Sequence, residues 1–142
     1  MIVLVDTPIW SLALRRSQVD LNVEQEALRR ELAELIGEGR ARLLGPIRQE
    51  ILSGIKEAAQ FERLREHLRA FPDDPLTVED YEEAARCHGH CRRAGIAGSA
   101  IDFLLCSAAL RRKWVIFTAD EDFGRYAKQL PIRLHRPRRI ER

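Results

Sequence analysis

Residues 2–10 read IVLVDTPIW, and this stretch decides the fold class. Its first four residues are all apolar, which is typical of a strand buried on both faces of a sheet. Thr7 and Pro8 then predict a helix over about residues 7–16, with Thr7 as its cap and Pro8 at the first helical position. A buried strand that leads at once into a helix indicates an α/β fold.

Strand-like and helix-like segments continue to alternate along the chain. Strands joined through helices imply right-handed crossovers and parallel pairing. We therefore expect an α/β protein, a three-layer α/β/α sandwich with a mainly parallel sheet. With 142 residues the chain can bury a core, so we expect one domain over residues 1–142. Further helices are expected at 22–37, from Pro46, at 56–70, 77–93, 99–112 and 121–129, and further strands at 42–44, 114–118 and 132–135.

Several helix ends carry recognisable signals. Thr77, with Asp80 three residues later, resembles a capping box. Ser99 is expected to cap the next helix. Gly37 or Gly39 is expected to end the helix at 22–37, because glycine readily adopts the left-handed conformation found after helices.

The composition is that of a folded globular protein. Hydrophobic residues make up 45% and charged residues 32%, which excludes a disordered chain. No apolar run approaches the roughly 18 residues of a membrane helix, and the apolar start is too short for a signal peptide. We therefore expect a cytoplasmic protein with no membrane partner. The three cysteines do not form a disulfide framework. The chain lacks the Gly-x4-Gly-Lys-Ser/Thr sequence of P-loop nucleotide enzymes.

Three acidic residues directly follow expected strands. Asp6 comes immediately after the first strand, and Asp120 and Asp122 follow the strand at 114–118. Because the carboxyl ends of parallel strands share one edge of a sheet, we expect these side chains at the same edge. Ligands of open α/β sheets bind at that edge, so it is the place to look for a site.

Two more acids lie near the start of expected helices. Asp102 is three residues after Ser99, and Glu50 is four residues after Pro46. Converging carboxylates cannot all ionise cheaply unless a cation neutralises them. Oxygen ligands suit Mg²⁺ or Mn²⁺, and such ions can activate water and stabilise a leaving oxygen. The acids therefore predict metal-assisted hydrolysis of a phosphodiester.

Each acid also has a purely structural interpretation. Asp102 could be a capping residue near a helix dipole, and Asp6 could be a turn residue at a strand end. Asp120 and Asp122 could cap the next helix, and Glu50 could be an exposed helical residue. For any single acid the structural interpretation is the more frequent one. Acids from four separate segments, all expected at one edge of the sheet, nevertheless favour a common site.

Residues 87–91, CHGHC, look like a metal motif. Cys87 and Cys91 are one helical turn apart and share a face, whereas His88 and His90 point to other sides of a continuous helix. A structural zinc site needs four ligands in a closed tetrahedron. Buried cysteines with incidental histidines are the better interpretation.

Four segments resemble, in order, the motifs of the PIN domain family, and specifically of VapC-type toxins. The resemblance covers about residues 2–135. In the first motif, an apolar strand is followed by an Asp and a hydroxyl residue. In the second motif, a Glu is the functional acid. In the third, an Asp opens an Ala-rich helix, and the fourth motif is rich in acidic residues. Pro8 departs from the pattern, because a Ser is frequent there. The segments are VLVDTPIW (3–10), GPIRQEILSG (45–54), GIAGSAIDFLLCSAA (95–109) and FTADEDF (117–123).

The resemblance implies a metal-dependent endoribonuclease, the toxin of a VapBC-type toxin–antitoxin pair. Asp6 and Asp102 would be the core ligands of Mg²⁺ or Mn²⁺, and Glu50 and Asp120 would complete the acidic pocket. Thr7 would support the pocket through a hydrogen bond. Members of the family differ in which acid of the last motif reaches the metal, so Asp122 remains an alternative to Asp120. RNA as substrate, homodimerisation and inhibition by a VapB antitoxin follow from the resemblance alone.

Basic residues are the candidates for contact with RNA. Arg92 and Arg93 closely precede the Asp102 motif and are the first choice for contact with phosphates, although cations are also favoured at helix ends. The basic end of the chain could neutralise phosphates or be a solvated terminus. Its arginines are Arg133, Arg136, Arg138, Arg139 and Arg142.

Two further questions are left open by the sequence. Phe61, Leu64 and Leu68 form an apolar stripe that could be core or a groove for an antitoxin helix. A catalytically silent PIN-like module that binds RNA or protein is the alternative function. The retained acids argue against it, because buried carboxylates without a cation destabilise a fold.

Overall fold

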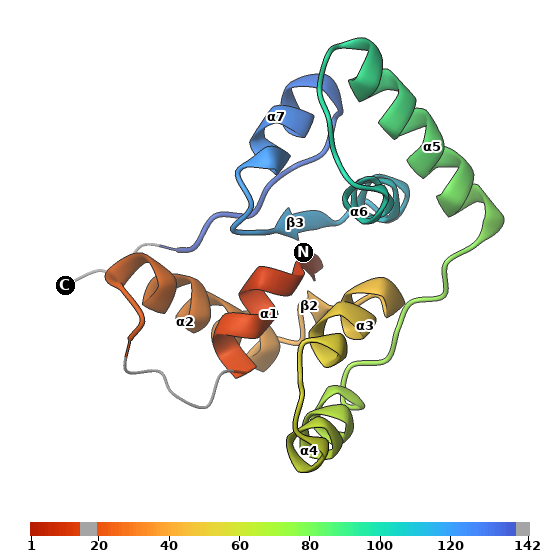
Figure 1. Cartoon of the computed structure of the whole chain (residues 1–142). Helices are drawn as coiled ribbons and strands as arrows, with labels where there is room; N and C mark the ends of the chain where they lie inside the picture. The colour runs from red at the N-terminus through yellow and green to blue at the C-terminus, as the bar shows by residue number, and fades with distance from the viewer. Residues whose placement is uncertain (15–19, 139–142) are drawn as a thin grey trace.

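The structure, a computed structural model, describes residues 1–14 and 20–138. Within these ranges, helices and strands alternate as the sequence predicts (Figure 1). The elements are β1 (Val3–Val5), α1 (Thr7–Leu14), α2 (Val23–Gly37), β2 (Ala41–Arg42), α3 (Gly45–Ser53), α4 (Ala58–Leu68), α5 (Val78–Arg93), α6 (Ala100–Arg112), β3 (Val115–Phe117) and α7 (Asp122–Gln129).

The three strands form a parallel sheet in the order β2-β1-β3. In the register, Val3 lies opposite both Ala41 and Val115, so β1 is the central strand. All three residues of β1 are fully buried, as the apolar run predicts. The parallel pairing confirms the predicted topology, and it places the carboxyl ends of β1 and β3 side by side.

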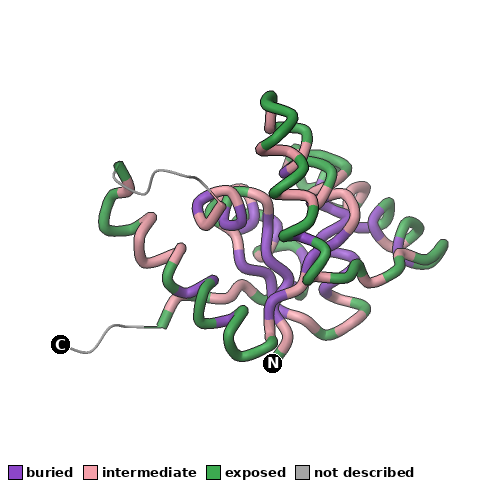
Figure 2. The backbone as a smooth tube through the Cα atoms, turned by 90° about the horizontal axis from the view of Figure 1, so that it is seen from below, coloured by how far each residue is buried: buried purple, intermediate pink, exposed green. Residues whose placement is uncertain are grey.

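The helices flank the sheet in two groups (Figure 1). Helices α1 to α4 gather on one side, and α5, α6 and α7 gather on the other, next to β3. Figure 2 shows the buried residues concentrated in the central strands and on the inner faces of the helices. This arrangement confirms the predicted α/β/α architecture. No helix within the described residues is long and apolar enough to cross a membrane.

The predicted helix ends are confirmed where local signals are strong. The Asn22 side chain caps α2, and Gly39 follows that helix with a φ of 69°. Thr77 and Asp80 form the expected capping box of α5. The hydroxyl of Ser99 accepts a hydrogen bond from the backbone N–H of Asp102 at 3.1 Å, which caps α6.

Two expected strands differ from the structure. The strand expected at 42–44 is Ala41–Arg42, because Leu44 serves as the N-terminal cap residue of α3 and leaves the sheet. The strand expected at 132–135 pairs with β3 through a single parallel bridge between Ile116 and Leu134. Pro131 and Pro137 bracket this segment, and proline cannot donate to a sheet ladder.

The start of α1 also differs from the prediction. Thr7 is the first helical residue and not the cap. The Asp6 carboxylate accepts a hydrogen bond from the Thr7 N–H at 2.8 Å, so Asp6 takes the capping role. The end predicted for this helix, near residue 16, lies outside the described residues.

Candidate active site

A cleft of about 510 Å³ opens at the carboxyl edge of the sheet. Four of the five acids that the sequence singles out line it, namely Asp6, Glu50, Asp102 and Asp120. Each comes from a different segment: the end of β1, the helix α3, the first turn of α6 and the loop after β3. The predicted convergence of these acids is therefore observed.

A second cavity of similar volume, about 530 Å³, lies beside β2, at the edge of the sheet. It also contains two acids, Asp73 and Asp74. Asp73 is paired with Arg48 at 2.8 Å, and Asp74 is paired with Arg112. Because arginines already neutralise these acids, this cavity lacks the excess negative charge of the first cleft.

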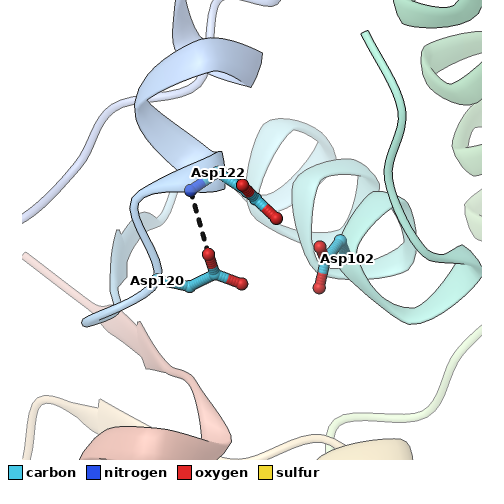
Figure 3. Close-up of side chains that lie close together, drawn as sticks. All are labelled: Asp102, Asp120 and Asp122. Atoms are coloured by element: carbon cyan, nitrogen blue, oxygen red, sulfur yellow. Dashed lines mark hydrogen bonds between the residues drawn. The ribbon is translucent and has the colours of Figure 1, made fainter.

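Among the described residues, Asp102, Asp120 and Asp122 form a group of acids close enough to hold one metal ion together. One oxygen of each lies within 4.8 Å of the other two. Figure 3 shows their side chains facing a common space from the start of α6, the loop after β3 and the start of α7. The Asp122 N–H donates to Asp120 Oδ1 at 2.9 Å, which orients the Asp120 carboxylate. Asp122 is also paired with Arg125.

Asp6 is the most buried acid of the cleft, with 6% of its surface exposed. The Thr118 hydroxyl donates to its Oδ2 at 2.8 Å, and the Thr7 N–H donates to its Oδ1. Burial nevertheless raises the pKa of Asp6 from 3.8 to about 6, and the nearby charges of Asp102 and Glu50 add to the increase. The surroundings of Asp6 therefore disfavour its ionised form.

Thr7 holds Glu50 in the cleft. Its hydroxyl donates to Glu50 Oε1 at 2.9 Å across 43 residues of sequence. The carboxylate of an otherwise exposed helical side chain is thereby directed toward the end of β1. The supporting hydrogen bond expected of Thr7 therefore exists.

Two residues of the site escaped the sequence analysis, Thr118 and Tyr126. Thr118 connects two acids, because its hydroxyl donates to Asp6 and accepts from the Asp120 N–H at 3.0 Å. The Tyr126 hydroxyl donates to Asp102 Oδ2 at 2.7 Å. Burial raises the pKa of Tyr126, so the hydroxyl remains a protonated donor.

Weak signals for both residues exist in the sequence. Thr118 ends the apolar strand two residues before Asp120, where a hydroxyl can form a local turn. Tyr126 is four residues after Asp122, so both lie on one face of α7. Nothing in the sequence, however, separates Tyr126 from an ordinary core aromatic residue.

Other candidate residues lie away from the cleft. Arg92 and Arg93 are exposed at the C-terminal end of α5, and Arg93 lines a separate hollow. Cys87 and Cys91 are buried in the core, as predicted, and His88 stacks on Phe103 with ring centroids 4.6 Å apart. Among the described residues, the histidines and cysteines join no group that could hold a metal ion.

The basic end of the chain is attached to α2 as far as the structure describes it. Arg138 pairs with Glu31 at 2.7 Å and with Glu38 at 2.9 Å. His135 contacts Glu31 at 2.6 Å. These acids engage Arg138, so it is not a free cation. Arg139 and Arg142 lie outside the described residues. On α4, Leu68 is fully buried, while Phe61 and Leu64 are half-buried.

The chemistry of the cleft suits a hard divalent cation. All its charged groups are carboxylates, and their oxygens are the ligands that Mg²⁺ and Mn²⁺ prefer. A cation there would offset both the crowding of Asp102, Asp120 and Asp122 and the cost of ionising buried Asp6. The residues present therefore fit a metal site.

Solved structures with the same fold include three that cover most of the chain. FitAcB from Neisseria gonorrhoeae has a TM-score of 0.75 and 20% identity, over 96% of this chain and 98% of that one. VapBC2 from Rickettsia felis, solved with a DNA fragment from its promoter, has a TM-score of 0.70 and 17% identity, with coverage of 95% and 98%. A toxin–antitoxin complex from Klebsiella pneumoniae has a TM-score of 0.58 and 18% identity, with coverage of 86% and 90%. At these identities the likeness establishes the fold.

No curated protein sequence matches the chain significantly. The family profile of the PIN domain, in contrast, matches residues 3–129, which include β1, the helices α1 to α7 and every acid of the cleft. The chain therefore belongs to the PIN domain family.

Proposed function

We propose that the protein is a metal-dependent endoribonuclease and the toxin of a VapBC-type toxin–antitoxin pair. The observation that carries this proposal is the convergence of Asp6, Glu50, Asp102 and Asp120 on one cleft, with Asp6 buried and its pKa raised to about 6. Perturbed carboxylates in a cleft are typical of functional sites. Membership of the PIN family and the fold shared with a toxin–antitoxin complex support the same conclusion.

In this proposal Asp6, Asp102 and Asp120 hold Mg²⁺ or Mn²⁺. When bound, such an ion activates water and stabilises the leaving oxygen of a phosphodiester. Asp122 is the alternative to Asp120 as a ligand. We favour Asp120, because it lines the cleft and its carboxylate is oriented by the Asp122 N–H, whereas Asp122 is already engaged by Arg125.

Glu50 and the hydroxyl residues have separate roles. Glu50, directed by Thr7, completes the acidic pocket and can accept a proton near the scissile phosphate. Thr118 fixes the relative positions of Asp6 and the loop that carries Asp120. These hydrogen bonds restrict the carboxylates before substrate binds, as efficient catalysis requires.

Incubation of the purified protein with total cellular RNA tests the proposal. Mn²⁺ or Mg²⁺ should yield discrete fragments that EDTA and the variant Asp6→Asn abolish. Asn keeps the size of the side chain and removes its charge. Asp20→Asn, at an exposed acid outside the cleft, is the matched control and should cleave normally.

Two outcomes would reject the proposed mechanism. Cleavage that survives EDTA or Asp6→Asn would exclude hydrolysis by the carboxylate cluster. Absence of any metal-dependent cleavage, with RNA affinity unchanged by Asp6→Asn and Asp102→Asn, would instead support a catalytically silent module that binds RNA or protein.

We also propose that the protein acts in the cytoplasm, as a homodimer, and that a VapB-type antitoxin inhibits it. The fold shared with VapBC2 and with the Klebsiella complex supports an antitoxin partner. Light scattering on the purified chain, alone and after coexpression with its antitoxin, would measure both assemblies. A monomeric mass in both samples would reject both assignments.

A further inference from the structure

Tyr126 combines complete burial with a single specific polar contact. None of its surface is exposed, yet its hydroxyl donates to Asp102 Oδ2 at 2.7 Å. A buried hydroxyl normally requires a partner, and here the partner is a carboxylate that faces the cleft. The contact joins α7 to the first turn of α6 across 24 residues of sequence.

The aromatic ring of Tyr126 is held in place from several sides. Its centroid lies 4.8 Å from that of Phe103 and 5.1 Å from that of Phe123. Gly98 packs directly against this group, because a Cβ there would lie 2.7 Å from Phe103 Cε2 and would collide with the Tyr126 hydroxyl. Close packing leaves the ring one position, so the hydroxyl is a rigid donor.

This rigid donor acts on the cluster of carboxylates. Tyr126 lies four residues after Asp122, so α7 supplies both an acid and the donor that holds the facing acid. With Oδ2 anchored by Tyr126, the rotation of the Asp102 carboxylate is restricted, and the carboxylate faces the space that it shares with Asp120 and Asp122 (Figure 3). Hydrogen bonds of this kind orient metal-binding carboxylates and tune their affinity.

We propose that Tyr126 is a positioning residue that holds Asp102 in the orientation needed to bind a divalent cation. Packing against Gly98 and Phe103 fixes the position of the Tyr126 ring. This inference rests on the proposed metal-dependent function. It assigns a role to a residue that neither contacts the cleft nor carries charge. Tyr126 acts through Asp102 alone.

Mn²⁺ binding measured by calorimetry, together with RNA cleavage at increasing Mn²⁺, tests the role of Tyr126. Tyr126→Phe keeps the ring and removes only the hydroxyl. Because Asp102 is partly exposed, its carboxylate stays hydrated and the fold should persist, but the carboxylate loses its fixed donor. We expect the Mn²⁺ dissociation constant to rise about 10- to 100-fold, as is usual when the partner of a metal ligand is removed. Saturating Mn²⁺ should restore most of the cleavage rate, which a general folding defect would not allow.

A second variant and a matched control complete the experiment. Gly98→Ala keeps the hydroxyl but displaces it, and it should weaken Mn²⁺ binding in the same direction. Tyr81→Phe removes a hydroxyl from an exposed tyrosine on α5 and should leave Mn²⁺ affinity unchanged. Thermal melting establishes that each variant unfolds cooperatively.

The outcomes separate this inference from the proposed function. If wild type binds Mn²⁺ and cleaves RNA, but folded Tyr126→Phe binds Mn²⁺ within about twofold of wild type, the positioning role is wrong and the function stands. If wild type binds no Mn²⁺, the proposed function fails and the inference fails with it. Loss of cooperative unfolding in both Tyr126→Phe and Gly98→Ala would show that the hydroxyl serves folding, and would also overturn the inference.

Discussion

Asp6 is a carboxylate in a place that disfavours its charge. It follows a fully buried strand, and the Thr118 hydroxyl and the Thr7 N–H only partly offset the loss of water around it. Burial is the largest cause of its raised pKa, and Asp102 and Glu50 are smaller ones. Ionised Asp6 lowers the stability of the metal-free protein, and a bound cation would offset its charge. Such a cost in stability is typical of a functional site.

The raised pKa of Asp6 predicts a pH-dependent stability of the metal-free protein. Asp6 titrates near pH 6 in the fold and near 3.8 when unfolded, so the folded state binds more protons between these values. Stability is therefore fully present below about pH 4 for this group and is lost as pH rises through 6. A shift of about two pKa units corresponds to about 3 kcal/mol.

Urea unfolding in EDTA measures this effect. Asp6→Asn should raise the free energy of unfolding at pH 7.5 by up to about 3 kcal/mol, because it removes the buried charge. At pH 4 the variant and wild type should differ little. Equal stabilities at pH 7.5 would show that Asp6 ionises without cost in the fold.

At the scale of elements, the pair α5 and α6 is connected by a buried ionic network. Asp80 is fully buried, and it accepts hydrogen bonds from the Thr77 N–H at 2.8 Å, from Arg111 and from Arg112. Arg112 in particular holds the pKa of Asp80 well below its usual range. The Ser107 hydroxyl donates to the Asp80 carbonyl at 2.6 Å. This network attaches the C-terminal half of α6 to α5. The first turn of α6, at the other end of the helix, carries Asp102.

Replacement of Asp80 by Ala should lower the free energy of unfolding by about 3 kcal/mol, because loss of one partner leaves a half-buried arginine without its main acceptor. The value is at the low end for buried pairs, since Arg112 also pairs with Asp74. Chemical denaturation measures it. Glu83→Ala, in the exposed pair with Arg86 on the same helix, is the control and should cost under about 1 kcal/mol. Similar losses in both variants would mean that the network contributes no more than a surface pair.

Over the whole molecule, charge is nearly balanced, with 24 lysines and arginines against 22 acids. If the protein binds RNA as proposed, the attraction must therefore depend on where the cations lie. Arg138 is paired with Glu31 and Glu38, whereas Arg92 and Arg93 are exposed at the end of α5, just before the loop that leads to Ser99 and α6. Under the proposed function, we expect these two arginines to contact phosphates beyond the cleft.

The salt dependence of RNA binding tests the role of Arg92 and Arg93. In an Asp6→Asn background that does not cleave, Arg92→Ala with Arg93→Ala should weaken binding. The slope of log affinity against log salt should fall by about 0.7 for each phosphate of single-stranded RNA that the variant no longer neutralises. Arg63→Ala with Arg65→Ala, on α4, makes the same change in net charge and should leave the slope nearly unchanged. Identical slopes in all proteins would exclude the assigned role.

The sequence by itself determined the features that depend on local rules. An apolar run defines β1, Thr7 and Pro8 mark the start of α1, and parallel strands bring Asp6 and Asp120 to one edge. The capping residues Thr77 and Ser99 were predictable, because a cap bonds to backbone only two or three residues away.

Only the tertiary structure decided the contacts between distant segments. Thr118 reaches Asp6 across 112 residues, and Tyr126 reaches Asp102 across 24, and no local pattern encodes either hydrogen bond. The raised pKa of Asp6 likewise depends on how much water the packed helices exclude. Local sequence places a side chain on an element, whereas the packing of the elements decides what that side chain meets and how costly its charge is.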